Sequence, residues 1–378
     1  MNYLWVGPST SCPTGYARET KLFTPRIRDS GRGVVIGAYV GMTAGAVVNT
    51  DGITELPRYQ DQLLHDVLPA YMAYTQSDAV ITVVEPSVLN GNIYGKFSWV
   101  VRAGVNAEPI PASWHLEKAA AIWSCTRWGQ RQLRTAGFES TYVPLAVDTK
   151  VFCPVNRLEA QEHLGQMAGY SVDDRFVVLT VAANHSNPSI KNFAGLFEAV
   201  ARVAAELPET TLVVVSDPDN PQGVNLRQLA QMFGIADRVV FPPLIGLALG
   251  IPDSFLNLLY NAADVFTLIS LTESFGLPAL EAQAAGTPVI LTGGGALAEL
   301  CFSGHLVECD PLPGWLWAHG SQWKLPRVDS IVRRLRYAAS QRNLIGPRDH
   351  AREGALSLDV NVVFDRYMLP ALEAFEQR

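Results

Sequence analysis

Two series of apolar, strand-like runs alternate with helical segments along this chain, and the alternation restricts the fold more than any other feature. The first series opens at residues 3–6 and the second at residues 176–182. Strands that are apolar on both sides and separated by helices are typical of parallel sheets covered by helices on both faces. The sequence therefore predicts an α/β protein with two Rossmann-like, doubly wound parallel sheets.

The expected elements follow from apolar periodicity and from the glycine and proline positions that end each run. For the first series the expected strands are residues 3–6, 33–39, 79–84, 98–102, 120–125 and 141–144, and the expected helices are 15–30, 59–75 and 127–136. For the second series the expected strands are residues 176–182, 211–216, 238–241, 264–270 and 289–292, and the expected helices are 192–206, 226–233, 254–261 and 279–285.

Length and composition fit a two-domain globular enzyme. The chain has 378 residues, of which 48% are hydrophobic and 17% charged, so each half can bury a sizeable core. Its five cysteines are scattered without a Cys-x-x-Cys pair, which indicates neither a zinc site nor a disulfide framework. The longest uncharged apolar run, residues 34–48, falls short of the ~20 residues that span a bilayer. A cytoplasmic protein without a membrane span is the expectation.

The segment 263–292 reads as strand, tight loop, helix and strand. Pro278 stands in the first helical turn, where the missing N–H costs nothing, and Gly286 ends the helix. The N–H groups of residues 275–277 then face out of the helix start, a place that attracts phosphate. Glu273 lies on the loop and Glu281 about one turn inside the helix. Both could face one molecule that carries hydroxyls and a pyrophosphate, which describes a nucleotide sugar.

The nine residues Glu273-Ser-Phe-Gly-Leu-Pro-Ala-Leu-Glu281 resemble the donor-binding signature of retaining glycosyltransferases of the GT-B fold, family 4 type, also called glycosyl transferases group 1. The resemblance implies that Glu273 contacts sugar hydroxyls and that Glu281 holds the ribose. It assigns the sugar and phosphate contacts to Ser274, Phe275, Gly276 and Leu277.

The same resemblance implies the GT-B architecture, in which two Rossmann-like domains face each other across a cleft. Residues 144–154 resemble the hinge entry of that family, and residues 359–370 resemble its closing helix. The expected domains are an acceptor-side domain, 1–168 completed by a helix at about 360–378, and a donor domain, 169–359.

A departing pyrophosphate needs positive charge or helix N-termini to stabilise it. Lys191 follows a polar loop at the start of a predicted helix, where a cation is unfavourable unless an anion binds. Family members carry an Arg and a Lys across this loop, and Lys191 resembles the second of the pair. The Arg is missing here; Asn184 or His185 stands near its place. Lys191 and Glu273 are therefore the expected catalytic pair.

The expectations for the first domain concern the acceptor. Small residues at the first helix start let backbone N–H groups approach a ligand, so Gly15, Tyr16 and Arg18 are candidate acceptor-side residues. Asn106 stands where related chains tend to have Asp. The segment 217–219, Asp-Pro-Asp, reads as an ordinary turn, so no metal and no cofactor besides the donor substrate is expected.

The leading interpretation is a metal-independent retaining glycosyltransferase of the hexosyltransferase type, which acts on a nucleotide-diphosphate sugar. Alternatives are a nucleotide-sugar 2-epimerase, a phosphorylase, or a nucleotide-sugar-binding protein that has lost catalysis. A nicotinamide dehydrogenase is disfavoured because no Gly-x-Gly-x-x-Gly follows a strand. The acceptor stays open among a glycan, a lipid-linked sugar, a small metabolite and a modified nucleic-acid base.

Overall fold

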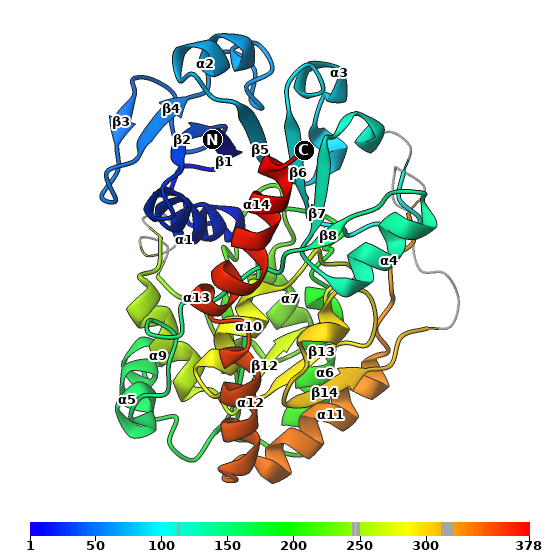
Figure 1. Cartoon of the computed structure of the whole chain (residues 1–378). Coiled ribbons are helices and arrows are strands. Elements are labelled where there is room, and N and C mark those ends of the chain that lie inside the picture. The colour runs from blue at the N-terminus through cyan, green and yellow to red at the C-terminus, as the bar shows by residue number, and fades with distance from the viewer. Residues whose placement is uncertain (112–113, 244–245, 247–249, 311–320) are drawn as a thin grey trace. The chain divides into compact units, whose positions relative to one another are not determined.

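The computed structural model describes residues 1–111, 114–243, 246, 250–310 and 321–378. The chain forms two compact units, one built mainly from residues 1–146 and 360–378 and the other from 147–310 and 322–359 (Figure 1). Each unit contains one sheet flanked by helices, which confirms the predicted α/β class with two doubly wound sheets.

The sheet of the first unit has eight strands in the order β3-β4-β2-β1-β5-β6-β7-β8. Every neighbouring pair is parallel except β3 and β4, which are antiparallel. The chain winds outward from β1 in one direction and from β5 in the other, so the strand order reverses between these two. The strands are β1 (Asn2–Gly7), β2 (Gly33–Ala38), β3 (Val47–Val48), β4 (Thr54–Pro57), β5 (Ala79–Val84), β6 (Trp99–Ala103), β7 (Ala121–Ser124) and β8 (Thr141–Tyr142). The helices are α1 (Gly15–Asp29), α2 (Leu68–Tyr74), η1 (Pro86–Val88), α3 (Gly91–Tyr94), η3 (Leu116–Lys118), α4 (Arg127–Thr135), α13 (Val360–Val363), η6 (Phe364–Met368) and α14 (Leu369–Glu376).

The sheet of the second unit has six parallel strands in the order β11-β10-β9-β12-β13-β14. The order reverses between β9 and β12, the two central strands. The strands are β9 (Phe176–Val181), β10 (Thr210–Val215), β11 (Val239–Val240), β12 (Val265–Leu268), β13 (Val289–Thr292) and β14 (Gly304–Val307). The helices are α5 (Arg157–Ala168), α6 (Phe193–Ala204), α7 (Leu226–Met232), η4 (Ala236–Arg238), α9 (Asp253–Ala262), α10 (Leu277–Ala284), η5 (Leu297–Leu300), α11 (Val328–Gln341) and α12 (Gly346–Leu356).

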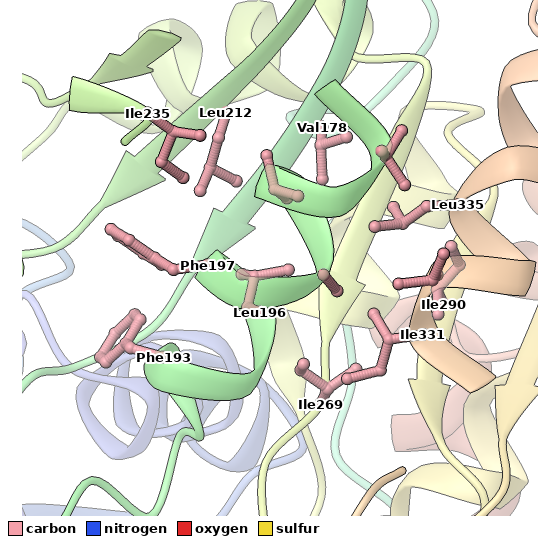
Figure 2. Close-up of a cluster of buried hydrophobic side chains, with 14 of the residues drawn as sticks. Val178, Phe193, Leu196, Phe197, Leu212, Ile235, Ile269, Ile290, Ile331 and Leu335 are labelled. Atoms are coloured by element: carbon pink, nitrogen blue, oxygen red, sulfur yellow. The ribbon is translucent and has the colours of Figure 1, made fainter. Parts of the chain in front are cut away.

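A buried cluster joins the helices of the second unit to its sheet (Figure 2). Helix α6 places Phe193, Leu196 and Phe197 on one face because these positions recur at the helical spacing of three and four residues. Helix α11 adds Ile331 and Leu335. Full burial of such side chains contributes ~1.5–3 kcal/mol each, so this cluster holds the central strands in fixed positions.

The first unit differs from expectation between residues 59 and 75, where a single long helix was predicted. Only α2 (Leu68–Tyr74) is helical. Upstream, Asp61 Oδ1 accepts hydrogen bonds from the N–H groups of Leu63 and His65, at 2.7 and 3.3 Å. Leu64 has a positive φ of 62°. A carboxylate that captures backbone N–H groups competes with helix formation, which explains the late helix start.

The boundary between the units lies earlier in the chain than the expected residue 168. Residues 147–168 pack within the second unit, where Asn257 and Asn261 of α9 hold the incoming segment. Asn257 Oδ1 accepts from Cys153 N at 3.1 Å, and Asn261 Oδ1 accepts from Val155 N at 2.9 Å. These amide side chains replace the backbone partners that an extended segment lacks.

The C-terminal segment belongs to the first unit. Arg32 donates from Nε and Nη2 to the two carboxylate oxygens of Glu376, both at 2.7 Å, and Tyr3 OH donates to Glu376 Oε1 at 2.9 Å. The bidentate pair connects the end of α14 to the segment between α1 and β2, and Figure 1 shows α14 running alongside this unit. None of the helices in the described ranges combines the length and apolar character needed to cross a bilayer.

The hydrogen bond from Arg32 lowers the pKa of Glu376 from its ordinary value of 4.5. Because the pKa is lower in the folded protein, the ionised carboxylate increases the free energy of unfolding at pH values above 4.5. This contribution is lost as the pH falls through the pKa of the folded state. Glu376→Gln should therefore lower the free energy of unfolding by about 1 kcal/mol at neutral pH and reduce its dependence on acid. Urea unfolding between about pH 7 and pH 3 tests this, with Glu139→Gln, an exposed glutamate of the same unit, as the control. Equal acid sensitivity of wild type and Glu376→Gln would contradict it.

Candidate functional site

The central strands of the second sheet create a natural ligand position. Strands β9 and β12 are parallel neighbours, and the strand order reverses between them. The loops that follow both strands lie at the carboxyl edge of the sheet, and Leu271 N donates to Ile190 O at 2.8 Å to join them. In open α/β sheets, ligands bind outside the carboxyl ends of the strands at such a reversal.

Lys191 and Glu273 meet at this position. Lys191 Nζ donates to Glu273 Oε1 at 2.5 Å, and Ser270 Oγ donates to the same oxygen at 2.8 Å. The side chains are 17% and 13% exposed, so the pair is reachable but largely shielded from water. No described residue forms a hydrogen bond with Glu273 Oε2. The site thus presents one carboxylate oxygen and the remaining N–H groups of an ammonium to a ligand.

The loop after Glu273 turns sharply into α10. Gly276 is the residue before the helix and has a φ of 105°. A Cβ at this position would lie 2.6 Å from Leu297 Cδ2, so both the backbone and the packing require glycine. Phe275 is buried and Leu277 begins the helix, with Pro278 in its first turn. The strand, loop and helix are as the sequence predicts, and Ser274 to Leu277 lie together at the start of α10.

Glu281 lies inside α10 and is buried. Its side chain is 2% exposed, and Oε2 accepts a hydrogen bond from the buried Tyr260 OH at 2.8 Å. Tyr260 comes from α9, which packs against α10. The sequence predicts that Glu281 faces the ligand together with Glu273. In the structure its carboxylate is buried and bonded to a phenol, and its contact with a ribose stays a prediction.

Asn184 and His185 differ in what they can offer. The Asn184 amide is buried: Nδ2 donates to Asp217 O at 2.9 Å and to Val224 O at 2.8 Å, and Oδ1 accepts from Val224 N at 2.9 Å. Both amide hydrogens are used, so Asn184 shapes the loop in place of donating to a ligand. His185 is exposed, and its Nδ1 lies 3.1 Å from Asn220 Nδ2. With the amide as donor, the neutral ring carries its proton on Nε2.

The acceptor-side candidates fall in the first unit, after strands β1 and β6. Gly15, Tyr16 and Arg18 share the first turn of α1, where the Thr14 hydroxyl accepts from Ala17 N at 3.2 Å and caps the helix. Asn106 follows β6 and is half-buried. The structure therefore brings three of these four residues into one helical turn.

The Asp-Pro-Asp segment is a local turn. Asp217 Oδ1 accepts from Asp219 N at 3.1 Å, and Asp219 Oδ2 pairs with Arg227 at 2.9 Å. In the described part of the chain no three His, Cys, Asp or Glu side chains come together as a metal site.

Sequence reasoning missed two residues of the site. Ser270 ends the run that precedes the loop and aligns Glu273, and Tyr260 holds Glu281. A hydroxyl three residues before a functional carboxylate is a weak signal for Ser270. For Tyr260 the sequence carries no signal, since the contact depends on how α9 packs on α10.

Comparison with known proteins identifies the same region. Residues 175–316 match the family described as glycosyl transferases group 1. D-inositol 3-phosphate glycosyltransferase of Stackebrandtia nassauensis is 38% identical over 175 residues, which cover 44% of this chain and 36% of that protein. The enzyme of the same name from Mycobacterium tuberculosis is 32% identical over 219 residues, 55% of this chain and 38% of the relative. The matched segments thus span well under half of these relatives' length.

Solved structures extend the likeness to the whole chain. Sucrose-phosphate synthase from Thermosynechococcus elongatus superposes with a TM-score of 0.77 at 17% identity and covers 100% of both chains. Anabaena HepE, solved in complex with UDP, superposes with a TM-score of 0.71 at 18% identity and covers 99% of this chain and 100% of its own. At such identities the likeness establishes the fold of both units.

Proposed function

The chain carries a glycosyl transferases group 1 domain on the GT-B fold, and from this we propose that it is a retaining glycosyltransferase that moves a sugar from a nucleotide sugar to a hydroxyl acceptor. The observation that carries the proposal is the Lys191–Glu273 pair, held at the reversal point of the second sheet beside the start of α10. The ammonium group can bind the diphosphate of a nucleotide sugar, and the carboxylate can bind its sugar.

In this proposal each half of the pair has one task. Lys191 donates its remaining N–H groups to the departing diphosphate, and the start of α10 adds the partial positive charge of a helix N-terminus. Glu273 Oε2 accepts a hydrogen bond from a sugar hydroxyl and so orients the sugar ring, while Ser270 Oγ donates a hydrogen bond to Oε1. His185 Nε2 takes the place of the missing arginine, because the Asn184 amide is already used.

Retention would follow attack on the same face of the sugar from which the phosphate leaves. The bond from the anomeric carbon to the phosphate oxygen breaks, and a bond from that carbon to the acceptor oxygen forms. The departing phosphate oxygen accepts the acceptor's proton. Positive charge from Lys191 and the helix start stabilises the phosphate without a metal ion. The acceptor is a hydroxyl of a glycan, lipid-linked sugar, small metabolite or modified base.

The donor side suggests which compounds to test first. Anabaena HepE was solved with UDP, and the pneumococcal O-GlcNAc transferase GtfA, with a TM-score of 0.58, was solved with UDP and GlcNAc. UDP-sugars therefore lead a panel that also contains GDP-, ADP- and TDP-sugars. The five cysteines are free, which fits the reducing cytoplasm as the proposed location.

Thermal unfolding of the whole chain at increasing concentrations of each nucleotide sugar tests the proposal. One donor class should raise the melting temperature, since a ligand at 100 times its Kd adds about 2.7 kcal/mol to the free energy of unfolding. Lys191→Met should weaken binding, whereas Lys150→Met, an exposed lysine of the same unit, should not. Binding followed by nucleotide release and a glycoside of retained configuration supports the proposal. An epimerised sugar, a sugar phosphate, or binding without release in the presence of acceptors would instead favour an epimerase, a phosphorylase or a non-catalytic binder.

A further inference from the structure

The second unit has a cavity at the edge of its sheet opposite Lys191 and Glu273. Its volume is about 190 Å³. Asp264, Val289 and Gly304 line it, and they stand at or just before the amino ends of β12, β13 and β14. Because the strands are parallel, this edge is the far one from the loops that follow β9 and β12. The cavity is therefore separate from the candidate donor site.

The cavity wall carries an excess of positive charge. The guanidinium groups of Arg342 and Arg348 supply the charge, two histidines, His305 and His350, stand beside them, and Asp264 is the one carboxylate among the lining residues. Both carboxylate oxygens of Asp264 have partners: Oδ1 pairs with Arg157 Nη2, and Oδ2 accepts a hydrogen bond from Val177 N at 2.8 Å. No described carboxylate pairs with Arg342 or Arg348, although the exposed Asp349 follows Arg348 in the chain.

Both guanidinium groups keep unused donors. Arg342 donates from Nη1 to Asp174 O at 3.0 Å, and Arg348 donates from Nη2 to Ala263 O. An arginine has five N–H groups, so most of the donors on each side chain have no partner among the described residues. A guanidinium with free parallel N–H groups matches the oxygens of a phosphate or a carboxylate.

Burial makes the missing counter-ion costly. Desolvation and, to a smaller extent, the charge of the nearby Arg157 lower the pKa of Arg348 to about 10, and Asp264 offsets only part of that shift. The start of the eleven-residue helix α12 also contributes Pro347, Arg348 and His350 to the wall, so the positive end of its dipole lies at the same cavity. An anion in the cavity would relieve this unbalanced charge.

We propose that this cavity, which we call the basal pocket, is a second anion-binding site that takes a small oxyanion, a phosphate monoester or a carboxylate. Arg342 and Arg348 hold the anion, and the exposed Tyr337 ring, which packs edge-on against His305 with centroids 4.7 Å apart, contacts the ligand's body.

Calorimetric titration of the whole chain with inorganic phosphate, and separately with acetate, at constant ionic strength in chloride tests the basal pocket. Arg342→Gln should weaken binding about tenfold, which corresponds to the loss of one charged hydrogen bond. Arg348→Gln should weaken it similarly. The matched control is Arg333→Gln, an exposed arginine of α11 that pairs with Glu308 at 2.8 Å, and it should bind as wild type does.

Lys191→Met separates this site from the donor site, because phosphate can also bind at Lys191. Binding that survives Lys191→Met and weakens in Arg342→Gln supports the basal pocket. A stronger response to phosphate than to acetate identifies a phosphate ester as the ligand class, and the reverse identifies a carboxylate. The proposal is overturned if neither anion binds, or if Lys191→Met abolishes binding while Arg342→Gln leaves it unchanged. Should Arg348→Gln fail to fold, the half-buried Arg342 still decides the outcome.

Discussion

Lys191→Met should lower kcat by about a hundredfold or more with the preferred donor, because a preorganised charge aimed at a leaving group is worth that much in comparable sites. Glu273→Gln should cause a loss of similar size, since it removes the charge that pairs with Lys191 and replaces one of the two accepting oxygens with a donating NH2 group. The measurement is steady-state nucleotide release, together with a product assay.

Stability must be measured on the same variants, because Lys191 and Glu273 form a largely shielded ion pair with a distance of 2.5 Å. A folded Lys191→Met protein with full turnover would refute the assignment. Ser270→Ala gives a graded check: it removes the 2.8 Å hydrogen bond to Glu273 Oε1 but leaves the charge, so its effect on kcat should be smaller than that of Glu273→Gln. Lys150→Met is the control variant, because Lys150 contacts neither Lys191 nor Glu273.

The sequence predicted the central strands well because their signal is local. Strand β5 (Ala79–Val84) and strand β13 (Val289–Thr292) have the expected bounds, since a run of buried apolar residues reads the same in any parallel sheet. The edge strand β3, its neighbour β4 and the edge strand β14 were not predicted. They are short, and β3 is exposed, so their pairing is determined by position in the sheet and leaves little pattern in the chain.

In the candidate site, too, features with a local sequence signal were predicted and features set by packing were not. The loop that carries Glu273 follows from glycine and proline chemistry, and Lys191 follows from a cation at a helix start. The partners of Glu281 and Asn184 do not follow from sequence, because a buried Tyr260 and the backbone of residues 217 and 224 come from distant segments. Which partners a buried polar side chain finds depends on the donors and acceptors that the packing brings near it.

The buried ion pair of the first unit leads to the largest expected effect on stability. Arg102 of β6 contacts Glu19 of α1, and both side chains are at most 2% exposed. Arg102 also donates to Val143 O at 3.1 Å and Pro144 O at 2.9 Å, and its guanidinium lies 5.0 Å from the ring centroid of Phe23. The pair therefore fastens the first helix to the sheet and to the segment that leaves β8.

Glu19→Leu should lower the free energy of unfolding by about 3–5 kcal/mol, because it leaves a guanidinium buried without its counter-charge. The double variant Glu19→Leu/Arg102→Met should recover part of that loss, because it removes the unpaired buried charge, although the carbonyl groups of Val143 and Pro144 lose their donors. Glu308→Ala, which breaks the exposed pair with Arg333, should cost at most about 1 kcal/mol. Chemical unfolding of the four proteins measures all three differences. If Glu19→Leu and Glu308→Ala cost the same, the burial of the charge is not what makes the first pair matter, and the helix must be held by its apolar contacts alone.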